Sequence, residues 1–343
     1  MALDLALTQV SQLAFGYWHS QVLIAAVELS VFDALADGPL SAEEVAERCA
    51  VPTDSALRLL DAATALRLLT RGADGGYSNS RTAERLLTTG SPESLVRWVR
   101  VMGRWYQPWG RLGQALEQGR AVEDRNERLT DDPAYVEDFI LGMHEYNSRT
   151  AEAVARALPA EDARRLIDVG GGAGSYSIAF CRVWEGLRAE VVDLAPVVEL
   201  AGKVIGEAGL ADRITARTGD YYQDAFGTDA DVVLLSNVLH QESPENCLSI
   251  LGRSAAALRP GGRVLVHGHF LEESRTAPVF TTLHNLSALA LWSGGRSYTT
   301  DEMAELMTAA GLSDIEVLPT AEQSARLLVG RTAGSGSAAG SAG

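Results

Sequence analysis

The chain has 343 residues, a length that suits one large domain and a smaller one, and a formal net charge of −16 at pH 7. This excess of negative charge argues against binding to nucleic acid or to anionic membranes. The three cysteines share no spacing typical of a metal site or a disulfide framework, and no apolar run is long enough to span a membrane. We therefore expect a cytoplasmic protein with reduced cysteines and with no nucleic-acid or membrane partner.

Residues 1–100 predict a mostly helical domain that ends in a hairpin. Ser41 and Glu44 form a capping-box pattern at the start of one helix, and a second helix is expected over Thr53–Leu66. Two short strands flank a turn at residues 74–76. Helices followed by a hairpin predict a winged-helix-like domain, an arrangement that is frequent in DNA-binding regulators.

The charge of the second helix bears on that function. A recognition helix needs a basic stripe that faces DNA, but the would-be recognition helix, Thr53–Arg67, offers Arg58 and Arg67 against Asp54 and Asp61. The mixed charge and the acidic chain disfavour DNA binding, and a DNA-binding regulator is kept only as an alternative.

A second domain is expected over residues 101–332, with linking helices in its first part, residues 101–160. A helix over 91–100, the last of the first domain, leads into it, and an exposed, charged loop is predicted over 118–132. The next helix starts at Asp132–Pro133 and runs to about Asn147, with one face formed by Phe139, Met143 and Tyr146. An aromatic cluster precedes it that either packs between the domains or lines an aromatic substrate pocket: Trp105, Tyr106 and Trp109.

A glycine-rich turn follows the apolar strand 166–169. Asp168 precedes the pattern Gly170-x-Gly172-x-Gly174, and a helix is expected from Ser175 to Val183. Glycine allows positive φ and the close approach of a ligand. The pattern has no lysine for a phosphate loop, and Ser175 stands where the dinucleotide pattern needs glycine or alanine. Because an acid before the glycines repels a pyrophosphate but can hold an ammonium, the turn favours S-adenosylmethionine (SAM).

The strands that follow end in polar residues suited to the rest of that ligand. Asp193 ends strand 190–193, where a ribose would lie, although NAD-binding folds share this feature. Asp220 and Tyr221 follow strand 214–218 and could bind and cover an adenine. The remaining elements predict an α/β, doubly wound Rossmann-like sheet with an antiparallel strand pair at its C-terminal end: strand 231–236, a turn at 260–262 into strand 263–270, helix 300–310, and strands 314–318 and 325–330.

The ordered set of motifs resembles the class I SAM-dependent small-molecule O-methyltransferases, the dimeric enzymes of plant phenylpropanoid and bacterial polyketide pathways. The resemblance extends to about Thr332, and residues 333–343 read as a disordered Gly/Ala/Ser tail. The segments that carry it are Asp168–Gly174, Asp193, Gly219–Tyr221, Leu239–His240, Arg259–Gly262 and Gly294–Thr299.

The resemblance implies partners and contacts beyond those read from the residues. It implies a homodimer formed through the N-terminal domain, and it places Met143 against the ring of the acceptor and the region of Asn147 near the SAM carboxylate. The expected acceptor contacts are Met143, Trp105, His284, Asn285 and Trp292. The expected cofactor contacts, for SAM and for its product S-adenosylhomocysteine (SAH), are Asp168, Gly170, Gly172, Asp193, Leu194, Asp220, Tyr221, Ser236 and Asn147.

His240 is the candidate general base. It follows the fourth strand of the sheet, at the edge where doubly wound sheets place their sites, and an imidazole titrates in the useful pH range. A phenol is largely protonated at neutral pH, so removal of its proton assists methyl transfer. The resembled family carries a histidine in this motif, which favours the catalytic role over a structural one.

The sequence departs from the plant enzymes around this histidine. Gln241–Glu242 follow it where the plant enzymes have Asp-Trp, and the two carboxylates that orient the base there would fall near Gly268 and Ser297. An imidazole without a carboxylate partner is a weaker base. The acids that could substitute are Glu242, Glu272 and Asp301.

Three further histidines lie close to this region in the sequence. His267 and His269 share one face of a strand, and His284 is on the following helix. Such a cluster could bind a metal, but no acid has a matching spacing, so we expect a polar pocket wall and no metal.

The sequence thus predicts a homodimeric SAM-dependent O-methyltransferase that acts on a small aromatic acceptor of specialised metabolism, such as antibiotic biosynthesis. Carbon methylation of an activated phenol ring is an alternative, because it needs a similar pocket and weaker deprotonation. A SAM-binding protein that has lost methyl transfer is another.

Overall fold

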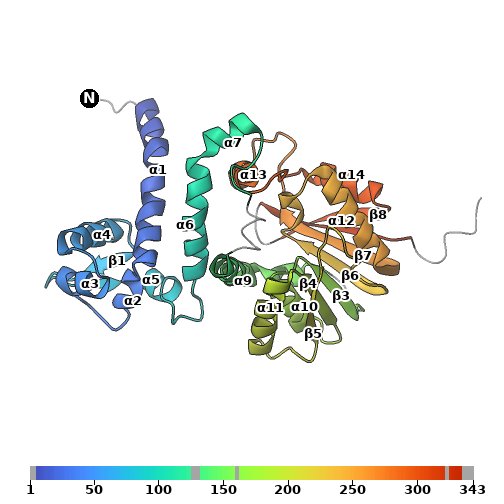
Figure 1. Cartoon of the computed structure of the whole chain (residues 1–343), viewed down its shortest axis with the longest axis horizontal. Coiled ribbons are helices and arrows are strands. Elements are labelled where there is room, and N and C mark those ends of the chain that lie inside the picture. The colour runs from blue at the N-terminus through green and yellow to red at the C-terminus, as the bar shows by residue number, and fades with distance from the viewer. Residues whose placement is uncertain (1–4, 125–131, 159–161, 321–323, 334–343) are drawn as a thin grey trace, which may run out of the picture. The chain divides into compact units, whose positions relative to one another are not determined.

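The computed structural model describes residues 5–124, 132–158, 162–320 and 324–333. The chain forms two compact units, Met1–Tyr106 and Gln107–Gly343, whose elements are labelled in Figure 1. Residues 125–131 of the expected loop at 118–132, and nearly all of the expected tail at 333–343, lie outside the described residues. Within the described ranges, no helix combines the length and the apolar character that a membrane crossing needs.

The first unit packs short helices against a two-stranded hairpin. The capping box is confirmed, because the Ser41 hydroxyl accepts from the Glu44 N–H at 3.2 Å and the Glu44 carboxylate accepts from the Ser41 N–H at 2.7 Å. Its elements are α1 Leu5–Glu28, α2 Val31–Ala34, α3 Ala42–Arg48, α4 Thr53–Ala65, β1 Leu69–Arg71, β2 Tyr77–Asn79 and α5 Arg81–Leu86.

Helix α6, Val96–Gly110, begins later than the predicted helix 91–100. A turn in which the Ser94 N–H donates to the Ser91 carbonyl takes up the first residues. The Ser94 hydroxyl then accepts from the Val96 N–H at 3.2 Å. Serine bonds its local backbone more readily than it continues a helix, which explains the difference.

The second unit is built on a seven-stranded sheet of order β5-β4-β3-β6-β7-β9-β8. Strands β5, β4, β3, β6 and β7 run parallel to one another, and β9 pairs antiparallel with both β7 and β8. This confirms the predicted doubly wound sheet with a C-terminal antiparallel pair. The bounds are β3 Arg165–Val169, β4 Arg188–Asp193, β5 Ile214–Thr218, β6 Ala230–Ser236, β7 Leu258–His269, β8 Ser313–Pro319 and β9 Ala325–Arg331.

Strand β7 starts earlier than predicted. Residues 260–262, expected to form a turn, belong to the strand, and Gly261 has a φ of +76°. The pairing with β6 shifts in register between Ala230 and Val232 at this point. The glycines thus mark an irregularity inside a long strand, and glycine within a strand is often a sign of this.

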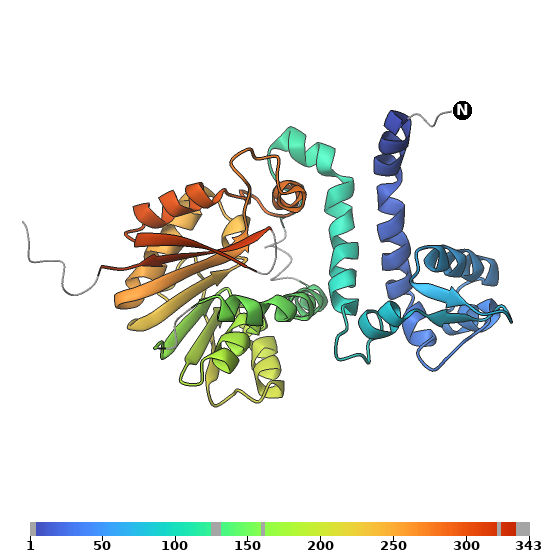
Figure 2. The same cartoon turned by 180° about the vertical axis from the view of Figure 1, so that it is seen from behind.

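Helices cover both faces of this sheet, as Figures 1 and 2 show. One core joins the sheet to α9, α10 and α11, and the other joins it to α12 and α14. The helical elements are α7 Leu112–Gln118, α9 Pro133–Arg156, α10 Ser175–Val183, α11 Ala195–Glu207, the short 3-10 helix η1 Leu239–Gln241, α12 Pro244–Ala256, α13 Val279–Leu291 and α14 Thr300–Ala309.

Helix α9 runs nine residues beyond its predicted end near Asn147. Its buried face continues through Ala151, Val154 and Ala155, which pack in the same core as α10 and α11. Burial of this face, and not the composition of the last turns, therefore sets the length of the helix.

Side chains alternate between the two cores along each central strand. Leu166 and Ile167 of β3 belong to opposite cores, and so do Leu265 and Val266 of β7. Since the five parallel strands all point the same way, the residues that follow them gather at one edge of the sheet.

Candidate active site

The glycine turn has the backbone that the sequence predicts. Gly170, Gly172 and Gly174 have φ values of +64°, +57° and +80°, a region that disfavours side chains. Gly174 caps α10, so the free N–H groups of that helix face the turn. A Cβ added to Gly172 would meet no atom within 4 Å, so the turn leaves open space beside this residue. A ligand can therefore approach the backbone here.

Asp168 lies beneath this turn. Its side chain is buried, and a Cβ on Gly171 would come within 2.7 Å of the Asp168 carboxyl carbon. Oδ2 accepts from the Ser177 hydroxyl at 2.7 Å, whereas the buried Oδ1 has no hydrogen-bond partner. Burial, helped by the charge of Asp193, raises the pKa of Asp168 to about 6 against the opposing effect of the Ser177 bond. An unpartnered, buried acceptor is a group that a cationic donor would satisfy.

Asp193 joins the end of β4 to the glycine turn. Oδ2 accepts from the Gly172 N–H at 2.8 Å, and Oδ1 accepts from the N–H of Leu194 at 2.8 Å. Leu194 is the N-cap residue of α11. These two bonds join the Asp193 carboxylate to the glycine turn and to the start of α11.

Asp220 and Tyr221 follow β5 next to this turn. The Asp220 carboxylate accepts from the Tyr222 N–H at 2.8 Å and from the side-chain amide of Gln223 at 3.0 Å. The Tyr221 ring borders Gly170, because a Cβ added there would lie 3.8 Å from two ring carbons. The structure thus brings the ends of β3, β4 and β5 together, as the sequence predicts.

Ser236 ends β6 at the same edge of the sheet. Its hydroxyl lies 3.0 Å from Nδ1 of His267, and the His267 ring packs 5.3 Å from the Tyr176 ring. Burial, reinforced by the nearby His269, lowers the pKa of His267 to about 3. Asn147 lies on α9, one helical turn after Met143, and both side chains are partly buried.

His240 occupies η1, directly after β6. Its ring centroid lies 4.7 Å from that of His284 and 5.3 Å from that of Trp292, and both pairs meet edge to face. Its backbone carbonyl accepts from the Arg296 N–H at 3.0 Å. The turn that carries the histidine is therefore fixed by the segment that follows α13.

The other histidines of this region are uncharged at neutral pH. Burial lowers the pKa of His269 and of His284 to about 4. Nδ1 of His269 lies 2.9 Å from the Ser324 hydroxyl, whereas the buried Nδ1 of His284 has no hydrogen-bond partner. In the part of the chain that the structure describes, no group of three or more His, Cys, Asp and Glu side chains is arranged to hold a metal ion.

The remaining predicted acceptor contacts differ in setting. Asn285 uses its side-chain oxygen to accept from the Ser297 N–H at 2.8 Å, and the Trp292 side chain is 1% exposed. Trp109 donates its indole N–H to Ser287 on α13 at 2.8 Å. Trp105 belongs to the first unit, and its contact with an acceptor stays a prediction.

Sequence reasoning missed the network around Glu242. Its buried carboxylate accepts from the hydroxyls of Tyr221 and Tyr222 and from the Asn246 amide. These partners occupy the carboxylate that we considered as a substitute orienting group for His240. The sequence signal for this network was one acid, two residues after His240. The hydrogen-bond partners of that acid depend on side-chain directions, which a sequence pattern does not give.

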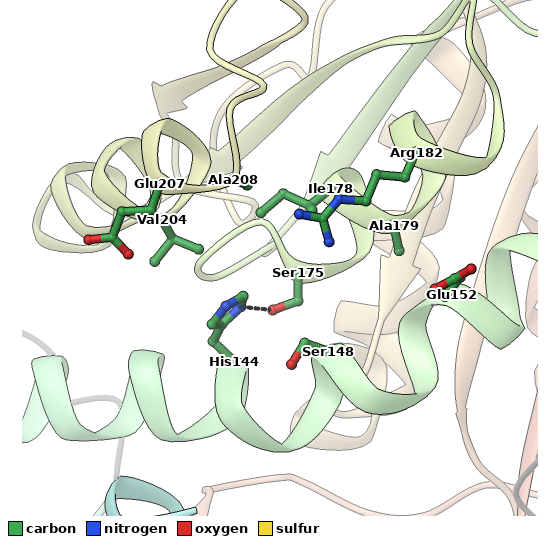
Figure 3. Close-up of a pocket in the computed structure, with 10 residues that line it drawn as sticks. All are labelled: His144, Ser148, Glu152, Ser175, Ile178, Ala179, Arg182, Val204, Glu207 and Ala208. Carbon is green, nitrogen blue, oxygen red and sulfur yellow. Dashed lines mark hydrogen bonds between the residues drawn. The ribbon is translucent and has the colours of Figure 1, made fainter. Parts of the chain in front are cut away.

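A cavity of about 280 Å³ lies between α9, α10 and α11, as Figure 3 shows. Nδ1 of His144 lies 2.8 Å from the hydroxyl of Ser175, the first residue of α10, and this bond ties α9 to the helix that follows the glycine turn. Burial lowers the pKa of His144. None of the residues predicted to bind the cofactor or the acceptor lines this cavity, whose walls are His144, Ser148, Glu152, Ser175, Ile178, Ala179, Arg182, Val204, Glu207 and Ala208.

Comparison with known proteins identifies the family of the chain. Family models for an O-methyltransferase domain and for an O-methyltransferase dimerisation domain match residues 119–313 and 11–89. The chain is 33% identical over 326 residues to a 3-hydroxy-5-methyl-1-naphthoate 3-O-methyltransferase of Streptomyces sahachiroi, covering 94% of each chain.

Solved structures agree over nearly the whole length. Human N-acetylserotonin methyltransferase in complex with SAM has a TM-score of 0.88 and 29% identity, and covers 97% of this chain and 100% of its own. The mitomycin 7-O-methyltransferase MmcR has a TM-score of 0.86 and 27% identity, and covers 96% of this chain and 98% of its own. The O-methyltransferase domain alone spans more than half of the present chain. The chain therefore belongs to the O-methyltransferase family and is a SAM-dependent O-methyltransferase.

Proposed function

We propose that this enzyme methylates a hydroxyl group of a small aromatic acceptor of specialised metabolism, with His240 as the general base. The observation that carries the proposal is the place of His240 at the edge of the sheet where β3 to β6 end, with aromatic rings on its sides. Relatives named for a hydroxynaphthoate and for a mitomycin as acceptors support the choice of substrate class.

The residues of the glycine turn fit the cofactor. The unpartnered Oδ1 of Asp168 suits the ammonium group of SAM, and the open space beside Gly172 admits its amino-acid end. The carboxylate of Asp193, at the end of β4, would accept from the ribose hydroxyls. Asp220 and Tyr221 would bind and cover the adenine, and the remaining proposed contacts are Gly170, Leu194, Ser236 and Asn147.

The chemistry asked of the protein is positioning and removal of a proton. Bound SAM supplies a methyl group that is already activated for an in-line displacement. His240 would accept the hydroxyl proton of the acceptor at a ring nitrogen, which makes the oxygen a better nucleophile. Because His269 and His284 have pKa values of about 4, they stay neutral at pH 7 and add no positive charge that would oppose protonation of His240.

The acceptor would lie against Met143 and the side chains of α13. The buried Nδ1 of His284 is free to bond a polar group of the acceptor. Asn285 and Trp292 complete the proposed wall. Aromatic and thioether side chains suit a flat aromatic ring.

The chain carries an O-methyltransferase dimerisation domain, and we propose a homodimer formed through it. Large apolar side chains on α1 are exposed in the single chain, and exposed clusters of this kind mark interaction surfaces. A second copy of the chain would cover them: Leu7, Val10, Leu13, Phe15, Tyr17 and Trp18.

Two substitutions test the role of His240. His240→Ala and His240→Gln should lower kcat by about 100-fold or more, the usual contribution of a general base, while calorimetry shows SAH affinity within about two-fold of the wild type. Added imidazole should partly restore the rate of the alanine variant. Wild-type kcat in both variants would contradict the base role, as would an equal loss of SAH binding.

A further inference from the structure

Glu242 is a buried carboxylate for which the proposed reaction has no use. It follows η1 and precedes Ser243, the N-cap of α12, and its side chain is 1% exposed. A buried carboxylate is costly unless donors surround it. Its position two residues after His240 makes its surroundings relevant to the active site.

The partners of Glu242 come from the adenine end of the site and from α12. Oε1 accepts from the Tyr221 hydroxyl at 2.8 Å and from the Tyr222 hydroxyl at 2.7 Å, and Oε2 accepts from the Asn246 amide at 3.0 Å. Burial and then the glutamate raise the pKa of the Tyr221 phenol well above its usual value, so that the hydroxyl remains a donor. Hydrogen bonds to a charged acceptor are the strong ones.

This arrangement holds two parts of the site at once. The Tyr221 ring borders Gly170 of the glycine turn, at 3.8 Å from the place of a Cβ. The backbone of the η1 segment is fixed from the other side, because Tyr298 donates its hydroxyl to the Glu242 carbonyl at 2.8 Å. The Arg296 N–H donates to the His240 carbonyl.

We infer that Glu242 is a positioning residue, which fixes the Tyr221 ring beside the glycine turn and thereby ties the adenosine end of the cofactor site to the turn that carries His240. The inference rests on the proposed function, in which Tyr221 covers the adenine. It assigns a task to Glu242, one of the two residues at which the chain departs from the plant enzymes that it resembles. Loss of the carboxylate should loosen cofactor binding first and turnover second.

The test uses the full-length enzyme and the variant Glu242→Gln, which keeps the shape of the side chain. The introduced amide oxygen can still accept from the tyrosines, but the introduced nitrogen opposes the Asn246 amide. SAH affinity should fall about ten-fold, KM for SAM should rise more than KM for the acceptor, and kcat should fall. A second change, Asn246→Asp, gives the nitrogen an acceptor and should restore most of the affinity.

Single hydroxyl deletions supply the controls. Tyr221→Phe removes the bond to the ring that covers the adenine and should weaken SAH binding several-fold, with a lower melting temperature because the buried carboxylate loses a donor. Tyr222→Phe removes a bond from a more exposed ring and should change SAH affinity by less than about three-fold. If Glu242→Gln fails to fold, Tyr221→Phe alone decides the question.

Two results would overturn the inference. One is a Glu242→Gln or Tyr221→Phe enzyme with wild-type SAH affinity and wild-type KM for SAM. The other is a loss in the single variant that Asn246→Asp does not reverse. Wild-type SAH binding is measured first, because its absence would refute the proposed cofactor site itself, whereas binding that is equal in all variants refutes only the role of Glu242.

Discussion

Asp168 shows what a single buried carboxylate can contribute to cofactor binding. Burial is the main cause of its pKa of about 6; the Ser177 bond opposes this rise, and the charge of Asp193 adds to it by a smaller amount. A ligand ammonium beside Oδ1 would favour the ionised form and lower this pKa. Below pH 6 the ligand must displace a proton, and above pH 6 the carboxylate is already charged.

We therefore expect SAH affinity to be constant above about pH 6 and to fall by up to ten-fold for each pH unit below it. Calorimetry between pH 5 and pH 8, in buffers of different ionisation enthalpy, should show proton release at the acid end of the range. Ser177→Ala removes the bond that holds the pKa down, so it should move the inflection to higher pH. Affinity that does not change across this range, or an unchanged profile in Asp168→Asn, would refute the ammonium contact.

Residues at the ends of strands could be predicted from the sequence, and their partners could not. Asp168, Asp193 and Asp220 each lie at or just after the carboxyl end of a parallel strand, so their common edge follows from the sheet alone. Which groups form a hydrogen bond depends on side-chain rotamers and on the approach of residues that are far apart in the chain. The bond from Tyr222 to Glu242 and the pair of His144 with Ser175 therefore could not be predicted.

At the level of elements, the neighbouring strand β4 holds the glycine turn open. Asp193 at the end of β4 accepts from the Gly172 N–H, which fixes the turn before any ligand arrives. The open space beside Gly172 is thus a property of two strands together, and a side chain there would enter it.

Substitution at two glycines tests this element. Gly172→Ala places a Cβ in the open space at a φ of +57°, which costs about 1 kcal/mol in backbone strain, and it should weaken SAH binding at least ten-fold. Gly202→Ala lies in the helix α11, where a Cβ also meets no atom within 4 Å, and should leave binding unchanged. Equal SAH affinities in titrations of the two variants would count against the glycine turn as the cofactor site.

The bounds of elements were predicted correctly where a turn residue follows soon after. Strand β5 and helix α10 have the expected bounds, because a glycine lies within three residues of the end of each. The ends of α6 and α9 differ from the prediction, because a local serine turn decides the first and packing against α10 and α11 decides the second.

For the whole molecule, we expect two copies joined through the first unit. On α1, Leu13 is 76% exposed and Trp18 is 53% exposed in the single chain, so burial of these side chains would favour association. The double variant Leu13→Glu and Trp18→Glu replaces both with charges and should shift the mass measured by light scattering from dimer to monomer. Arg58→Ala, which breaks an exposed ion pair on α4, should leave the dimer intact. A monomeric wild type, or a double variant that remains dimeric, would contradict this assembly.

The most direct test of the account is to follow the methyl group itself. The enzyme is incubated with SAM labelled with ¹³C in the methyl group and with a panel of hydroxylated aromatic compounds, and each product is examined by NMR. We predict a labelled methyl ether, with the methyl protons correlated to an aromatic ring carbon through oxygen, and loss of this signal in His240→Ala. Label on a ring carbon, or label that stays in SAM with every acceptor while SAH still binds, would contradict it.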